Sequence, residues 1–230
     1  MKKLFLVAAL MSGLQGAAQA GYQDGVDAAK AGRFDQALQE WLPLAEQGDA
    51  QAQTSIALLY LSGQGVARDD YAAVGWFRRA AEQGYAKAQY DLGVMYATGR
   101  GEWQNYRLAI EWYEKAAAQQ HADAQLNLGL MFAAGEGVAQ DYERAAAWYR
   151  QAAQQGNAAA MTNLGAQYYQ GQGVTQNKQT AYLLFALAAA HGDENGEKNR
   201  VALARDIKPE QQAEAQQLIT SWKAGSPLPQ

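Results

Sequence analysis

The chain has 230 residues, a formal net charge of −4 and no cysteine. Its lysines and arginines are scattered along the chain with no run longer than two, which disfavours a nucleic-acid partner because duplex binding needs a positive stripe that displaces phosphate counterions. The lack of cysteine excludes a disulfide framework and any thiol chemistry.

Residues 1–20 have the organisation of a secretory signal peptide. Two lysines precede an apolar run, and the segment ends on the small-residue sequence Ala-Gln-Ala. We expect cleavage after Ala20 and a periplasmic or secreted mature protein. No later segment is apolar over a spanning length, so no membrane insertion is expected after cleavage. Removal of Lys2 and Lys3 leaves 17 of the 19 basic side chains against 23 acidic ones, a net charge of −6.

Residues 21–49 predict an N-terminal helical hairpin that is shorter than the units after it. A first helix over residues 22–31 is ended by Gly32. The second helix is indicated by apolar residues on one face, namely Phe34, Ala37, Leu38, Trp41, Leu44 and Ala45. Pro43 lies within that pattern, and we expect it to kink the helix or to end it.

A 36-residue period organises residues 50–193 into four units, 50–85, 86–121, 122–157 and 158–193. Such a period indicates stacked supersecondary units rather than one globular core. Each unit predicts two helices, so the expected fold class is all-α. The second helices follow one repeated position that holds good N-cap residues, Asp69, Asn105, Asp141 and Asn177.

Glycines recur at two kinds of position. A Gly-x-Gly between the helices of each unit predicts positive φ, and it lacks the preceding strand and third glycine of a dinucleotide loop. A Leu-Gly pair recurs inside the first helices, at Gly93, Gly129 and Gly165. Glycine inside a helix costs roughly 1 kcal/mol against alanine, and we expect the neighbouring helix backbone to approach these positions closely.

The pattern A-x-x-x-L-G-x-x-Y-x-x-G-x-G-V, then D or N, then A-x-x-W-Y-x-x-A-A-x-x-G resembles the Sel1-like repeat, a relative of the tetratricopeptide repeat. It covers the four units of 50–193. The resemblance implies a right-handed superhelical solenoid of helix-turn-helix repeats. Three departures are local: Glu102 replaces the loop valine, Gln120 replaces the closing glycine, and Leu184 replaces the tryptophan.

After residue 193 the period stops. Residues 194–224 predict C-terminal capping helices, and Pro209 suits the first turn of the last one. That helix has Ala215, Leu218, Ile219 and Trp222 on one face. Residues 225–230 contain two prolines and are expected to form a disordered tail.

No catalytic, cofactor-binding or metal-binding residues are predicted. The two histidines, His121 and His191, lie near the ends of second helices, where interaction with the last carbonyls is expected. Asp193, Asn195 and Glu197 alternate like the start of a calcium loop, but the bidentate acid that should follow is missing.

One face of the first helices is the candidate site. Repeat positions 2, 5, 9 and 12 lie beside the buried stripe, and similarity to tetratricopeptide arrays places them on the concave side of the superhelix. The candidate groove residues are Leu58, Tyr90, Val94, Leu126, Leu130 and Tyr169. The alternative is that they pack against the next repeat. Trp103 in an inter-helix loop is a second candidate contact, with packing against its own loop as the alternative.

The resemblance implies a non-catalytic, monomeric periplasmic or secreted scaffold that binds another protein or peptide, as adaptors of envelope signalling or assembly do. An alternative comes from cysteine-rich exported Sel1-like proteins, which are associated with penicillin binding and β-lactam hydrolysis; their repeats carry disulfides, and this chain has no cysteine. Glycan binding by aromatic residues in the groove is a third possibility.

Overall fold

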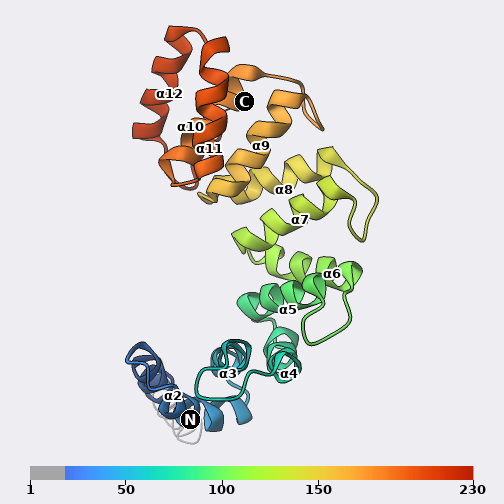
Figure 1. Ribbon diagram of the computed structural model, residues 1–230, viewed down its shortest axis with the longest axis vertical. Coiled ribbons are helices and arrows are strands. Elements are labelled where there is room, and N and C mark those ends of the chain that lie inside the picture. The colour runs from blue at the N-terminus through green and yellow to red at the C-terminus, as the bar shows by residue number, and fades with distance from the viewer. Residues whose placement is uncertain (1–18, 230) are drawn as a thin grey trace, which may run out of the picture. The chain divides into compact units, whose positions relative to one another are not determined.

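A computed structural model describes residues 19–229, and every regular element in that range is a helix (Figure 1). The first helix covers residues 19–30. The others are α2 (Phe34–Glu46), α3 (Ala50–Ser62), α4 (Asp70–Glu82), α5 (Ala86–Thr98), α6 (Tyr106–Ala118), α7 (Ala122–Ala134), α8 (Tyr142–Gln154), α9 (Ala158–Gln170), α10 (Lys178–Ala190), α11 (Glu194–Leu203), the short 3-10 helix η1 (Ala204–Asp206) and α12 (Pro209–Ser221). The all-α prediction is confirmed. Most of the predicted signal peptide lies outside the described residues.

The chain divides into two compact units, one up to Ala109 and one from Ile110 onward. In the first unit the N-terminal hairpin packs against α3. Trp41 is buried in this core, stacks on Tyr22 at 6.0 Å between ring centroids, and donates its indole N–H to the Tyr22 carbonyl at 3.1 Å. Pro43 does not end α2, which continues to Glu46.

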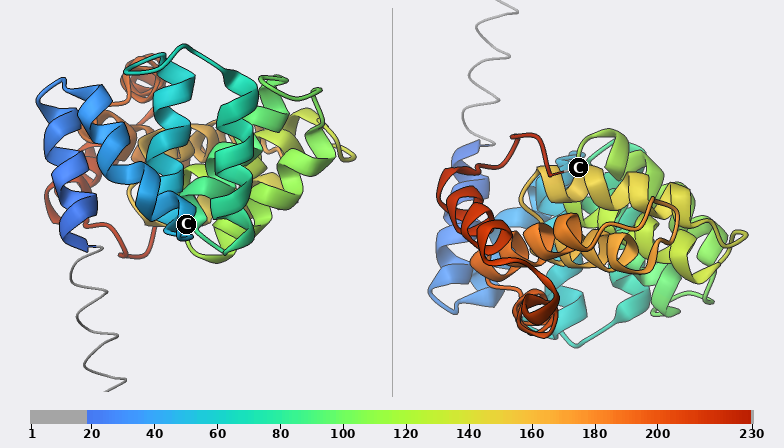
Figure 2. Two further views of the ribbon diagram at one scale, coloured as in Figure 1. Left: turned by 90° about the horizontal axis from the view of Figure 1, so that it is seen from below. Right: turned by 90° about the horizontal axis from the view of Figure 1, so that it is seen from above.

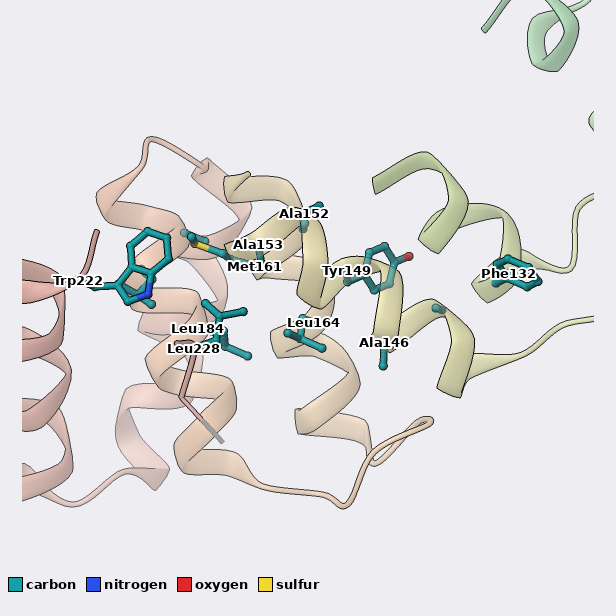
Figure 3. Close-up of a cluster of buried hydrophobic side chains, with 14 residues drawn as sticks. Phe132, Ala146, Tyr149, Ala152, Ala153, Met161, Leu164, Leu184, Trp222 and Leu228 are labelled. Atoms are coloured by element: carbon teal, nitrogen blue, oxygen red, sulfur yellow. The ribbon is translucent and has the colours of Figure 1, made fainter. Parts of the chain in front are cut away.

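The second unit contains two hydrophobic clusters. The larger cluster is built from α7, α8, α9, α10 and the C-terminal segment, and it includes Phe132, Tyr149, Leu164 and Leu184 (Figure 3). The smaller one joins α10 to α11 and α12 through Leu183, Phe185, Leu203 and Ala215. The segment 194–203 is the helix α11, within the range predicted for capping helices, and Pro209 is the first residue of α12, as predicted.

The four predicted N-caps are confirmed. The side chains of Asp69, Asn105, Asp141 and Asn177 each accept a backbone N–H of the first turn of the following helix, at 2.9 to 3.1 Å. These bonds satisfy donors that have no partner inside the helix. The start of each second helix is therefore determined by a local interaction that the sequence displays directly.

The two loop glycines have different roles. The first of each pair ends the first helix in the left-handed region, as Gly63 does at φ +68°. The second approaches the first turn of the preceding second helix: a Cβ on Gly101 would collide with the Asp70 carbonyl, and one on Gly173 with the Tyr142 carbonyl. Both positions therefore favour glycine for its φ, and the second also needs its lack of a side chain.

The glycines inside the first helices lie close to a neighbouring helix. A Cβ on Gly129 would clash with the ring of Tyr149, and one on Gly165 would lie 2.8 Å from the Phe185 ring and 3.3 Å from the Ala181 carbonyl oxygen. In each case these neighbours belong to the second helix of the same repeat unit. A helix backbone therefore approaches Gly165, as expected, whereas the nearest atoms at Gly129 belong to an aromatic ring.

The Glu102 departure from the repeat pattern has a partner. Its carboxylate accepts a hydrogen bond from Arg78 of α4 at 2.8 Å, and the same guanidinium donates to the Tyr96 hydroxyl at 2.9 Å. In the same loop Arg100 forms a two-bond pair with Asp70, at 2.9 and 3.0 Å. Charge pairs thus connect this loop to α4. The other repeat units have a valine at the position of Glu102.

Asp70 gives a pH-dependent prediction. Hydrogen bonds from Arg100 and then Arg68 hold the pKa of the Asp70 carboxyl well below its usual range. A depressed pKa contributes stability that is complete above the unfolded value of about 4 and is lost as the pH falls through the folded pKa. We expect Asp70→Asn to lower the free energy of unfolding by about 1 kcal/mol at neutral pH, and the difference to shrink below pH ~4.

The measurement is urea unfolding followed by circular dichroism from neutral to acidic pH. Asp206→Asn is the matched control, because its carboxylate pairs with a single exposed lysine. A difference for Asp70→Asn that stays constant down to the lowest pH would contradict the assignment.

The C-terminal segment contradicts the expected disordered tail over residues 225–229. Leu228 and Trp222 are both 8% exposed and belong to the larger cluster. The Gly225 N–H donates to the Gln154 carbonyl, and the Trp222 indole donates to the Pro227 carbonyl at 3.2 Å. The segment leaves α12 and runs back toward α8 (Figure 2, right). Its two apolar side chains are buried, which offsets the lack of regular structure.

Gln120, the second departure, is the one described non-glycine residue with positive φ, at +63°. The equivalent positions hold Gly84, Gly156 and Gly192. A left-handed conformation costs an L-residue about 1 to 2 kcal/mol. We expect Gln120→Gly to raise the free energy of unfolding by about 1 kcal/mol, because the left-handed conformation no longer has a cost. The gain is not larger because glycine also has more freedom in the unfolded chain. Urea unfolding tests this, with Ala118→Gly as a control that should lower stability.

Candidate functional site

Three predicted groove residues lie in the first compact unit, which ends at Ala109. Leu58 is on α3 and is 40% exposed, while Tyr90 and Val94 are on α5 and are partly buried. The helices α3 and α5 contact each other, so the three side chains belong to neighbouring first helices. Residues of the repeat's buried stripe, such as Ile56 and Leu92, are fully covered. The structure therefore separates a core face from a partly exposed apolar face on these helices.

The other three groove residues lie in the second compact unit, which begins at Ile110. Leu126 and Leu130 are one turn apart on α7; Leu130 is 42% exposed, whereas Leu126 packs partly against the larger cluster. Tyr169 on α9 is 43% exposed and lines a pocket of about 270 Å³. That pocket also includes Ala166, Phe185, Leu203 and Asp206. Leu126 therefore packs within the repeats, as the alternative expected, whereas Leu130 and Tyr169 remain exposed.

Trp103 is 92% exposed. The alternative of packing against its own loop is therefore wrong. The indole stands in the α5–α6 loop that Arg78 and Arg100 connect to α4 through Glu102 and Asp70. A large apolar side chain at the tip of an anchored loop is a ready contact for another molecule.

The histidines have structural partners. His191 Nδ1 lies 2.9 Å from the Leu187 carbonyl, as predicted for a helix end, and its ring meets Trp222 edge to face at 5.4 Å between centroids. His121 differs from the prediction, because its ring is the N-cap of α7 and accepts the Ala124 N–H at 3.4 Å. The expectation failed because α6 already ends at Ala118, whereas His121 directly precedes α7.

The acidic residues near 193 do not form a calcium loop. Asp193 is the N-cap of α11; it accepts the Gly196 N–H at 2.6 Å and the Thr162 hydroxyl at 2.8 Å. Glu197 pairs with Arg200 at 2.7 Å, and this contact lowers the pKa of the Glu197 carboxyl. Within residues 19–229 there is no cluster of three or more potential metal ligands. Burial raises the pKa of Tyr149 to about 12, so its phenol stays protonated at neutral pH.

Sequence reasoning missed a set of buried glutamines at the fourth position of three units. Their amide groups donate to a carbonyl in the last turn of the preceding helix, at 2.9, 3.1 and 3.3 Å for Gln53, Gln89 and Gln125. Two further glutamines donate to members of this set, Gln83 to Gln53 at 2.8 Å and Gln155 to Gln125 at 2.7 Å. The sequence signal for these residues was the recurrence of glutamine at the fourth position of three repeat units; the fourth unit has Met161 there.

Two comparisons decide the family. The Sel1 repeat profile matches residues 50–85, 86–121, 122–157 and 158–193, the same four ranges that the 36-residue period defines. The chain belongs to the Sel1 repeat family. A Sel1 repeat protein from Oxalobacter formigenes has a crystal structure that is 36% identical to it, with a TM-score of 0.72 over 76% of this chain and 72% of the other.

A second solved structure covers more of this Sel1 repeat chain. It is c5321, described as a protective antigen present in uropathogenic Escherichia coli strains and displaying an SLR fold, with 31% identity and a TM-score of 0.80 over 90% of this chain. The match covers 46% of the c5321 chain, so this Sel1 repeat chain spans about half of that protein. A putative Sel1 repeat protein from Klebsiella pneumoniae, 22% identical with a TM-score of 0.54, agrees in fold alone.

Membership of the Sel1 repeat family supports a coarse functional statement. Sel1 repeats are typically scaffolds for protein–protein interaction and are generally non-catalytic. No curated protein matches this Sel1 repeat chain. None of the helices within residues 19–229 combines the length and the apolar character that a bilayer crossing requires.

Proposed function

We propose that this Sel1 repeat protein is a monomeric, non-catalytic scaffold of the periplasm or the extracellular space. It binds another protein through apolar side chains on the exposed faces of its first helices. The observation that carries the proposal is the exposure of Leu58, Leu130 and Tyr169 at repeat positions 9 and 12, beside a fully buried stripe on the same helices. Exposed apolar side chains in a repeated position are typical of a surface that receives a partner.

Within each compact unit, the chemistry of the exposed first-helix faces favours an extended or helical peptide with apolar side chains. Leu58, Val94, Leu126 and Leu130 present aliphatic groups, while Tyr90 and Tyr169 add aromatic rings. Such anchors contribute most of the energy of an interface when a partner covers them. Trp103 offers a second anchor outside the first helices.

Site-specific photocrosslinking in the native compartment tests the proposal. Probes replace Tyr90 and Leu130, and a control probe replaces Arg79, an exposed residue of the second helix α4. We expect one protein adduct from both face positions and none from Arg79. Adducts at Arg79 alone, or at none of the three positions in cells that contain the partner, would argue against the face.

A matched pair of variants then measures the contribution of the face. Leu130→Lys should weaken binding of the crosslinked partner by about tenfold or more, because it places a charge in an apolar contact. Tyr71→Lys is the control, since Tyr71 is an exposed apolar residue on the second helix α4. Equal affinities for the two variants would exclude Leu130 from the interface.

The proposed compartment and the absence of catalysis have direct tests. Mass spectrometry of the exported protein should give a mature N-terminus at Gly21, and an intact Met1 would contradict export by cleavage. A chromogenic β-lactam assay distinguishes the scaffold from the hydrolase alternative. We expect no turnover above buffer.

A further inference from the structure

The C-terminal segment shows how a peptide segment with a turn packs against the ends of the helices, because the Ser226 N–H donates to the Lys223 carbonyl at 2.9 Å. Trp222 and Leu228 are buried in the cluster that includes Ala153, Met161, Leu184 and Leu187, and we call their position the C-terminal slot. Figure 3 shows both side chains at one end of the cluster, beside Leu184 and Met161. The segment is also held by its backbone, because the Gly225 N–H donates to the carbonyl of Gln154, the last residue of α8, at 2.6 Å.

An equivalent slot lies 36 residues earlier in the chain and is open. It is a pocket of about 460 Å³ between the end of α6, the start of α7 and the second half of α8. We call it the glutamine pocket, after its lining residues Gln120, Gln125, Gln151, Gln154 and Gln155, with Trp148 as its aromatic residue. The repeat register matches the two sites residue by residue: Gln125 with Met161, Trp148 with Leu184, and Gln151 with Leu187.

The glutamine pocket keeps the backbone acceptor of the C-terminal slot. Ala118 ends α6 as Gln154 ends α8, and it lines the pocket. Within residues 19–229 the Ala118 carbonyl accepts no hydrogen bond outside a helix. A peptide N–H can therefore bond to it as Gly225 bonds to Gln154.

The side chains of the pocket determine which peptide fits. No residue that lines it carries a charge. Gln120 is exposed, and Trp148 and Gln154 are partly exposed, so the polar groups of these three side chains can meet a ligand in the pocket. Amide groups and an indole N–H form hydrogen bonds with uncharged side chains that both donate and accept. In the C-terminal slot, by contrast, the apolar residues Met161 and Leu187 share a cluster with Trp222 and Leu228.

Gln120 adds an independent observation. Units elsewhere in the chain use glycine at this position, yet here a glutamine occupies the left-handed region and lines the pocket. A backbone conformation that is unfavourable for the residue and is retained beside an open pocket indicates a use for the side chain.

We infer that the glutamine pocket is a second protein-binding site, which takes an uncharged peptide segment with a turn and with amide side chains. The peptide lies across the end of α6 as residues 222–228 lie across the end of α8. This inference does not rest on the proposed function, because the pocket is formed by the end of α6, the start of α7 and the second half of α8, and none of the six predicted groove residues lines it.

Two synthetic peptides test the site on the full chain, whose own segment already fills the C-terminal slot. One copies residues 222–230 with alanine in place of Lys223, and the other carries in addition glutamine in place of Trp222 and Leu228. The readout is the Trp148 indole N–H resonance, assigned from the spectrum of Trp148→Phe. We expect the glutamine peptide to shift it in a saturable manner, and the copied peptide to bind about tenfold more weakly.

Exchange of the lining provides the matched control. Gln125→Met combined with Gln151→Leu copies the C-terminal slot while keeping Trp148 as the reporter, and it should reverse the preference between the peptides. Gln120→Gly copies Gly156 and should weaken binding of the glutamine peptide several-fold without loss of helix content. The inference is overturned if neither peptide shifts Trp148, if the double variant keeps the original preference, or if chitotriose shifts Trp148 and the peptides do not.

Discussion

Trp222→Ala is expected to lower the free energy of unfolding of this Sel1 repeat protein by about 3 kcal/mol, within the usual range for removing a buried aromatic side chain. Trp222 is 8% exposed, its ring contacts His191 edge to face, and its indole N–H donates a hydrogen bond to the Pro227 carbonyl. Its loss also releases the segment that covers Leu184. Urea unfolding followed by circular dichroism measures the effect.

Trp103→Ala is the matched control for Trp222→Ala, because the same side chain is removed from a position that is 92% exposed. We expect its effect on the free energy of unfolding to stay within about 0.5 kcal/mol. Equal losses for the two variants would mean that the C-terminal segment does not cover the cluster in solution.

Gly173→Ala should have the largest effect of a single added methyl group. The residue has φ +67°, and a Cβ would collide with the backbone of Tyr142 at the first turn of α8. The left-handed conformation costs about 1 to 2 kcal/mol for alanine. Displacement of a packed backbone adds a further cost, typically 1 to 3 kcal/mol. We expect a total loss of about 3 kcal/mol or more, measured as the shift of the urea midpoint.

Gly192→Ala separates the two costs. Its φ is +88°, and nothing lies within 4 Å of the added Cβ. The variant should therefore lose only the conformational part, about 1 kcal/mol. If Gly192→Ala proves as destabilising as Gly173→Ala, then φ alone explains the loop glycines and the close approach to α8 contributes nothing.

The architecture could be predicted because each signal is local or periodic. Asp69 and Asn177 cap the helix that follows directly, so a repeated Asp or Asn locates a helix start without knowledge of the rest of the fold. The buried stripe follows from helical periodicity. The fold and its family were therefore predicted from sequence, and the exposed positions of Leu58, Leu130 and Tyr169 remain the predicted site.

The failures have a common cause, which is a partner far away in sequence. The segment 225–229 lacks a periodic pattern, and its contact with Gln154 connects positions about seventy residues apart. At Gly129 the nearest atoms belong to a ring of another helix, not to the expected backbone. The buried glutamines were not predicted, since nothing local shows that a carbonyl of the preceding helix needs their amides.

The contact between each second loop glycine and the helix before it determines how such a chain can be lengthened. The loop at Gly65 approaches Phe34 and Asp35 of α2, just as Gly101 approaches the first turn of α4. The N-terminal hairpin therefore already offers the docking surface that every later repeat needs. A gene duplication that copies a whole 36-residue module would reproduce both halves of this contact, whereas an insertion within a loop would separate them. Length can thus vary in evolution by complete modules.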